Sequence, residues 1–164
     1  MAELLAGLSI ATLLLVLALP AWSTWLAEQR VRAAGSRLLA ALAAVRAAAV
    51  GSGVAVRLCP VATGGGCASQ RDWSRGWLGQ SGGTQGWRSI LESGPLSGGV
   101  RVEVNATMLE PGVAFDTRGF AVQTAGGGGF ASGSWLVCAT GARSRTVTLA
   151  PSGRARISTG GVCT

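Results

Sequence analysis

Arginine gives this chain its clearest chemistry. The 164-residue sequence contains 14 arginines, no lysine and seven acidic residues, so its net charge of +7 comes entirely from guanidinium groups. A guanidinium stays protonated and binds phosphate or carboxylate through a planar fork of N–H donors. The chain from Thr117 onward has no Asp or Glu and five arginines: Arg118, Arg143, Arg145, Arg154 and Arg156. This distribution predicts an anionic partner for the C-terminal third.

The residues that familiar catalytic mechanisms need are absent or unpaired. Residues 79–83 (GQSGG) match the G-x-S-x-G pattern of hydrolases, but that nucleophile requires a histidine base and the sequence has no histidine. The lack of lysine excludes a Walker A motif. Asp72 and Asp116 have no spacing that indicates a paired acid and base. We therefore expect no enzyme activity and no cofactor.

The four cysteines form no C-x-x-C pair, and without histidine a metal site would need all four thiolates at an unusual spacing. Two disulfides explain them better and imply an oxidising compartment such as the periplasm. Three pairings are formally possible. The simplest is local, with Cys59 bonded to Cys67 across a glycine-rich loop and Cys138 bonded to Cys163.

An uncharged segment from Leu4 to Trp22 opens the chain. Its 19 residues rise about 28 Å as a helix, close to the bilayer hydrocarbon thickness of about 30 Å, so the segment can span a membrane. A cleavable signal peptide ending near residues 18–21 is the alternative. Glu3 in place of a basic start, the length of the apolar run and the helical pattern beyond Pro20 argue against cleavage. We expect Pro20 to bend this helix without ending it.

The helical pattern continues through residues 23–50. Apolar residues recur at helical spacing, and Gly51 and Gly53 are suited to end the helix. The apolar positions are Leu38, Leu42, Val45 and Ala49. The arginines that follow the span would be held in the cytoplasm by the positive-inside rule, whereas disulfides need the opposite side. These arginines are Arg30, Arg32, Arg37 and Arg46.

The remainder of the chain alternates as strands do, with short glycine-containing turns between the apolar runs. The expected strands lie at residues 54–58, 100–104, 113–115, 135–137 and 145–149, and glycine-rich loops are expected at 94–99 and 126–129. The fold class is therefore α+β: one long N-terminal helix, residues 1–50, packed on a small antiparallel sheet head, residues 51–164, with two disulfides.

The start of the chain resembles type IV pilins and type II secretion pseudopilins. Glu3 opens an apolar helix, and Pro20 follows it at the spacing seen in that family. The resemblance implies that Glu3 pairs with the N-terminal amine of a neighbouring subunit during assembly. The family also has a short basic leader before the glutamate, whereas only Met1 and Ala2 precede it here, so we expect the true start to lie upstream. Such a leader would resolve the conflict in topology.

The head resembles the GspH/FimT group within that family. The motifs are residues 56–60 (VRLCP), 76–78 (GWL), 115–119 (FDTRG) and 153–156 (GRAR). Gly153-Arg154-Ala155-Arg156 resembles the Gly-Arg-x-Arg motif of DNA-binding FimT minor pilins, which implies that Arg154 and Arg156 contact phosphates. In an extended chain these two side chains project to one side about 6.6 Å apart.

Two further expectations concern the basic region. If the bridge between Cys138 and Cys163 holds its segments together, Arg143 and Arg145 extend Arg154 and Arg156 into one acid-free stripe that binds DNA without sequence preference. Trp135 would then add base stacking. The alternative is that these arginines only solvate an edge strand and discourage edge-to-edge pairing.

The resemblance implies a minor type IV pilin that waits in the bacterial inner membrane with its head in the periplasm. It then joins other pilins in a pilus at the cell surface and captures DNA for natural transformation. The alternative function is a structural, GspH-like pseudopilin of a type II secretion system that does not bind DNA.

Overall fold

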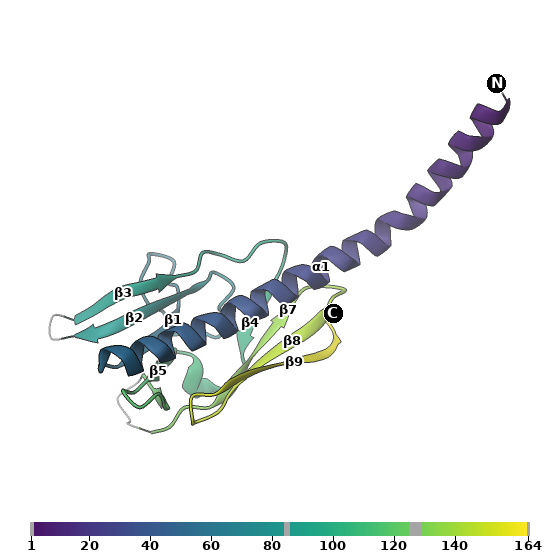
Figure 1. The fold of residues 1–164 in the computed structure, drawn as a ribbon. Coiled ribbons are helices and arrows are strands. Elements are labelled where there is room, and N and C mark those ends of the chain that lie inside the picture. Colours follow the sequence, from purple (N-terminus) through teal and green to yellow (C-terminus); the bar gives the residue numbers. More distant parts are fainter. Residues whose placement is uncertain (1, 84–85, 125–128, 164) are drawn as a thin grey trace.

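The computed structural model describes residues 2–83, 86–124 and 129–163. A single helix, α1 (Ala2–Ser52), leaves the head as a long curved rod (Figure 1). Pro20 lies inside α1 and does not end it, as expected. Gly53 adopts a φ of +67° and its N–H donates to the Ala49 carbonyl at 3.1 Å, which ends the helix with a left-handed glycine.

The described strands form two antiparallel sheets. The five-stranded sheet has the order β3-β2-β1-β5-β6 and the four-stranded sheet has the order β4-β7-β8-β9. The first contains β1 (Val56–Pro60), β2 (Trp77–Gly83), β3 (Gly86–Glu92), β5 (Val113–Phe115) and β6 (Ala121–Gln123). The second contains β4 (Arg101–Val104), β7 (Gly133–Cys138), β8 (Arg143–Leu149) and β9 (Ala155–Val162). A short 3₁₀ helix, Thr107–Leu109, follows β4.

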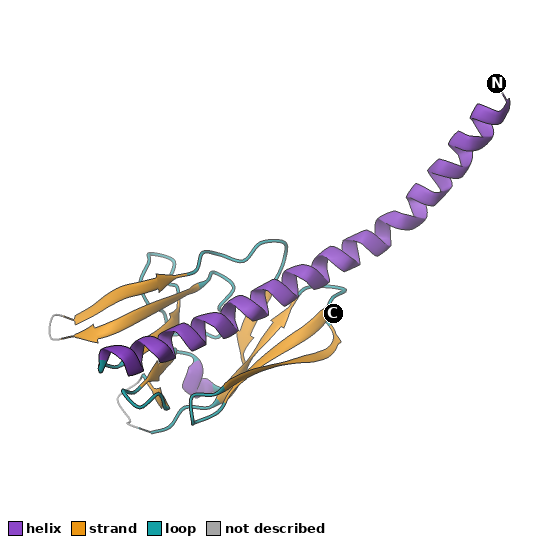
Figure 2. Ribbon diagram, in the orientation of Figure 1, coloured by secondary structure: helices purple, strands orange, loops and turns teal. Residues whose placement is uncertain are grey.

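The second half of α1 lies across both sheets and forms the centre of the core (Figure 2). Leu38, Leu42, Val45 and Ala49 are all buried, at the spacing that the sequence predicted. Three tryptophans, Trp73, Trp77 and Trp135, are the largest fully buried side chains. The α+β class is confirmed, with the expected antiparallel strands divided between two sheets.

Both expected disulfides are present. Cys59 is bonded to Cys67 with a Cα–Cα distance of 5.4 Å, and Cys138 to Cys163 with 5.9 Å. The second bridge joins the end of β7 to the residue after β9, so it fixes the end of the edge strand of the four-stranded sheet.

Several local expectations have clear outcomes. The five expected strands are found within about two residues of their predicted bounds. Residues 94–99 form a loop, and residues 126–128 of the other glycine-rich loop lie outside the described residues. The G-x-S-x-G match at residues 79–83 lies within β2, an inner strand of the five-stranded sheet, and not on the sharp strand-to-helix turn that a nucleophile elbow requires.

Candidate nucleic-acid interface

Arg154 and Arg156 lie at the turn between β8 and β9. Arg156 is opposite Thr148 in the antiparallel register, and both side chains are exposed. The next residue, Ile157, faces the other way and lies against α1, where its Cδ1 would be 2.8 Å from a Cβ placed on Gly35. Because successive side chains of a strand alternate, Arg156 is on the face of the sheet that points away from α1.

These two arginines line an open groove of about 420 Å³. The residues lining it are Thr148, Ala150, Ser152, Arg154 and Arg156, here called the outer groove. Among the residues that the structure describes, no Asp or Glu lines it. Two guanidinium forks beside two hydroxyl groups, without a competing carboxylate, suit the oxygen atoms of phosphate groups.

Gly153 sets the shape of the turn that presents Arg154. Its φ is +76°, and a Cβ added to it would be 2.0 Å from the carbonyl oxygen of Gly119. Two hydrogen bonds with Ala150 close the turn. The Gly153 N–H donates to the Ala150 carbonyl at 2.9 Å, and the Ala150 N–H donates to the Arg154 carbonyl at 3.0 Å. Glycine is therefore required here both for its backbone conformation and for its close packing.

Arg46 of α1 is a positioning residue that the sequence did not reveal. Its Nε donates to the Gly119 carbonyl at 3.0 Å and one of its terminal nitrogens donates to the Ser152 carbonyl at 3.3 Å. The Ala121 N–H also donates to the Pro151 carbonyl at 2.9 Å. The helix, the 116–119 turn and the turn of the outer groove are thus joined at one point. In the sequence, the position of Arg46 directly after Val45, which lies on the apolar face of the helix, was the signal that could have indicated this role.

The neighbouring turn is organised by Asp116. Its carboxylate accepts hydrogen bonds from the backbone N–H groups of Arg118 and Phe120, each at 2.9 Å, and pairs with the Arg118 guanidinium at 3.0 Å. Slight burial raises the pKa of the Asp116 carboxyl, but these hydrogen bonds and the Arg118 charge outweigh it, so the pKa is below its usual value. Arg118 is therefore partly neutralised and is a weaker phosphate ligand than Arg154 or Arg156.

Base stacking by Trp135 is excluded, because this side chain is fully buried. It packs edge-to-face on Trp73 with a ring-centroid distance of 5.3 Å. The expectation of stacking was wrong because residue 135 of β7 faces inward, opposite the buried Val147. Phe120, which directly follows the 116–119 turn, and Phe130 are exposed aromatic residues whose ring centroids are 5.8 Å apart.

The expected stripe of four arginines does not form. Arg145 pairs with Thr159 and shares the α1-facing side of the sheet with the buried Val147, and its Cβ would be 3.5 Å from a Cβ on Gly35. Arg143 and Arg145 line a small pocket of about 150 Å³ together with Glu28, Arg32 and Thr159. These two arginines are thus on the opposite face from Arg156 and have a carboxylate beside them.

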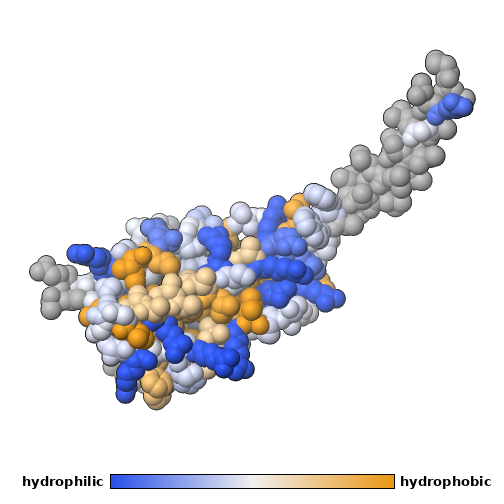
Figure 3. All heavy atoms as spheres, viewed as in Figure 1, coloured by the Kyte–Doolittle hydropathy of each residue, from blue (hydrophilic) through white to orange (hydrophobic). Residues whose placement is uncertain are grey.

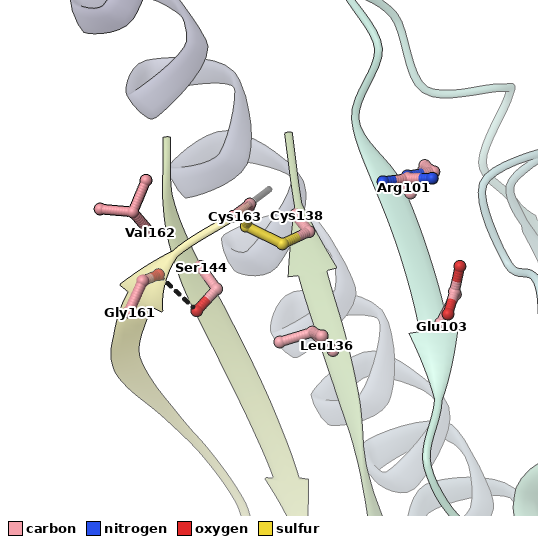
Figure 4. Close-up of a pocket in the computed structure, with 8 residues that line it drawn as sticks. All are labelled: Arg101, Glu103, Leu136, Cys138, Ser144, Gly161, Val162 and Cys163. Atoms are coloured by element: carbon pink, nitrogen blue, oxygen red, sulfur yellow. Dashed lines mark hydrogen bonds between the residues drawn. A yellow bond between two sulfur atoms is a disulfide. The ribbon is translucent and has the colours of Figure 1, made fainter. Parts of the chain in front are cut away.

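A second hollow, of about 460 Å³, lies on the outer face at the other end of the four-stranded sheet. Figure 4 shows Leu136 and the Cys138–Cys163 bridge near its centre, with Arg101 and Glu103 on β4 at one side. The Ser144 hydroxyl donates to the Gly161 carbonyl at 3.0 Å. Among the described residues, one cation and one carboxylate line this hollow, so it lacks the charge excess of the outer groove.

The N-terminal half of α1 carries the two residues assigned to assembly, Glu3 and Pro20. Glu3 is exposed in the first turn of the helix. Hydropathy and length also mark Trp22–Ser52 as long and apolar enough to cross a membrane. That part of α1 supplies the buried face of the head core, however, so the apolar segment before Trp22 is the part that fits a membrane anchor.

A helix with an apolar first half that projects from the head, and a second half that packs on antiparallel sheets, defines a pilin-like α+β subunit. Residues 34–153 match the sequence model of the family described as Type II transport protein GspH. The chain therefore belongs to the GspH family. The matched region ends at Gly153, immediately before Arg154 and Arg156.

Solved structures with the same fold come from both kinds of filament. The type IV minor pilin FimU of Pseudomonas aeruginosa is 15% identical, with a TM-score of 0.61 over 79% of this chain and 89% of that one. The minor pseudopilin EpsH from the Type 2 Secretion System of Vibrio cholerae is 11% identical, with a TM-score of 0.56 over 79% of this chain and 97% of that one. No significant match is found among curated protein sequences. These likenesses establish the fold of minor pilins and pseudopilins.

Proposed function

We propose that this chain is a minor pilin that joins a type IV pilus and binds DNA without sequence preference for uptake in natural transformation. The observation that supports this is the outer groove, where Arg154 and Arg156 are exposed and no described lining residue is Asp or Glu. We assign the phosphate contacts to these two arginines and not to Arg143 and Arg145, which lie on the other face of the sheet.

Assembly is the role of the stem, residues 4–22, and of Glu3. The stem holds the subunit in the inner membrane with its head in the periplasm, and Glu3 pairs with the N-terminal amine of a neighbour as the subunit enters the filament. An exposed carboxylate at the end of an apolar helix supports this role, because a charge in a hydrocarbon environment requires a partner. Pro20 is proposed to allow the bend that this packing requires.

Duplex binding by the full chain in neutral-detergent micelles tests the DNA assignment. Fluorescence anisotropy at several salt concentrations gives the slope of log K against log salt, which changes by about 0.9 for each phosphate neutralised. The double variant R154Q/R156Q should therefore reduce the magnitude of this slope by about two and weaken binding.

The matched control is R143Q/R145Q, which removes the same charge from the opposite face and should leave the slope unchanged. Equal effects from both pairs would show that net charge alone attracts DNA and would refute the site. No duplex binding by the native chain would instead support a structural pseudopilin.

A further inference from the structure

A second basic site lies where the stem leaves the head. It is the pocket of about 150 Å³ between α1 and the β8–β9 pair, lined by Glu28, Arg32, Arg143, Arg145 and Thr159, here called the junction pocket. In Figure 3, hydrophilic side chains gather at this end of the head, next to the stem. The pocket is separate from the outer groove, because Arg145 faces α1 and Arg156 faces away from it.

The junction pocket carries an excess of positive charge. Its described lining contains three guanidinium groups and one carboxylate, which gives a formal charge of +2. Within the described residues, the ion pairs are Arg71–Glu110 and Arg118–Asp116, so none of the three arginines is in an ion pair. Converging guanidinium forks with a threonine hydroxyl suit a phosphate group. The volume is that of a single small group and not of a duplex.

Two tryptophans place this pocket relative to a bilayer. Trp22 and Trp25 are 62% and 51% exposed, and their ring centroids are 5.4 Å apart. Exposed tryptophans at the end of an apolar helix are typical of the membrane interface. Glu28 and Arg32 follow Trp25 by three and seven residues, or roughly 5 and 10 Å along the helix axis. The headgroup layer extends about 5–8 Å beyond the hydrocarbon on each side.

We propose that the junction pocket binds the phosphate of an anionic phospholipid in the leaflet that faces the head. With Trp25 at the hydrocarbon boundary, Glu28 lies within the headgroup layer and Arg32 lies just beyond it, within reach of a long arginine side chain. The positive charge of the pocket selects an anionic lipid over a zwitterionic one. The inference rests on the proposed membrane stem and is independent of DNA binding, which uses the other face of the sheet. It also gives Arg143 and Arg145 a role that the outer groove does not.

Native mass spectrometry of the full chain in neutral micelles tests the proposal with phosphatidylglycerol and phosphatidylcholine as probes. Both lipids carry a phosphate, but only phosphatidylglycerol has a net negative charge to balance the excess of arginine in the pocket, so the native chain should retain phosphatidylglycerol at least about tenfold better than phosphatidylcholine. R143Q/R145Q should bring this ratio close to one. R154Q/R156Q, with the same loss of charge, should leave it unchanged.

Further variants and probes separate the alternatives. Arg32→Gln changes an exposed residue of α1 and should lower the ratio without disturbing the packing of Arg145 on Gly35. Displacement of the lipid by millimolar inorganic phosphate would assign the pocket to free phosphate. A native preference that survives both R143Q/R145Q and Arg32→Gln would overturn the proposal, as would an equal loss in R154Q/R156Q. Loss of DNA binding alone would leave it standing.

Discussion

At the scale of single residues, the turn between β8 and β9 that presents Arg154 depends on a glycine and an arginine that are not proposed to contact the ligand. Gly153 allows the turn to pack on Gly119, and Arg46 donates to carbonyls on both sides of that contact. The two arginines of the outer groove are therefore held on a supported turn and not on a free chain end. Such support reduces the ordering cost when a phosphate binds.

Substituting Gly153 by alanine should be costly for two separable reasons. A non-glycine residue in the left-handed conformation costs about 1–2 kcal/mol, and the clash with the Gly119 carbonyl should add about 1–3 kcal/mol. Gly141→Ala is the control, because Gly141 has nearly the same φ, +77°, but nothing within 4 Å of an added Cβ. Denaturant unfolding of both variants measures the difference. Equal losses of stability would show that the packing on Gly119 contributes nothing.

At the scale of elements, α1 and the alternating strands were predictable because their patterns are strong. Leu38, Leu42, Val45 and Ala49 recur at helical spacing and are all buried. β3 was missed because it is exposed along most of its length and shows no alternation. β9 was anticipated only as an extended segment at Arg154 and Arg156, because its residues beyond Ile157 are all exposed. β2 was missed because, after Leu78, four of its remaining five residues are glycine or serine, and a glycine-rich segment has low strand propensity.

The site was only half predictable for a related reason. The turn arginines could be recognised from their motif, but the face of each strand depends on register, which the motif does not specify. A register shift lies between Arg143 and Arg145, and Arg145 shares the inward face with Val147. A one-residue change in the register of β8 would therefore move Arg145 from the α1-facing side of the sheet, where the junction pocket lies, to the outer face.

The two disulfides should differ in their contribution to stability. They close loops with sequence separations of 8 and 25 residues. In the chain-entropy model, removing the Cys59–Cys67 bridge should cost about 2.5 kcal/mol and removing Cys138–Cys163 about 3.5 kcal/mol. Serine double variants, unfolded in urea and followed by the fluorescence of the buried tryptophans, provide the comparison. A larger loss from the shorter loop would contradict the entropic account.

At the scale of the whole molecule, a helical stem projects from the head, and apolar and basic surfaces occupy different positions along it. The apolar stem is at one end, the junction pocket follows it, and the outer groove occupies the face of the four-stranded sheet that points away from α1. This order suits the proposed pilin, which leaves a bilayer and then exposes its outer face to solution.

Glu3→Gln should block filament entry without blocking membrane insertion. Losing one partner of a desolvated ion pair costs about 3–5 kcal/mol, so the fraction of the subunit in sheared filaments should fall at least about tenfold. Glu28→Gln removes the same charge from the same helix inside the junction pocket and should enter filaments normally. Immunoblots of filament and membrane fractions measure both. Normal incorporation of the Glu3 variant would remove this residue from assembly.

The continuity of α1 has a mechanical consequence. The helix is uninterrupted from Ala2 to Ser52, and its second half is the centre of the head core. Tension applied to the stem therefore reaches both sheets directly, since no linker lies between them to absorb it. A retracting filament would pull on such a subunit through its most deeply packed element, and whatever the outer groove holds would travel with it as a load on that core.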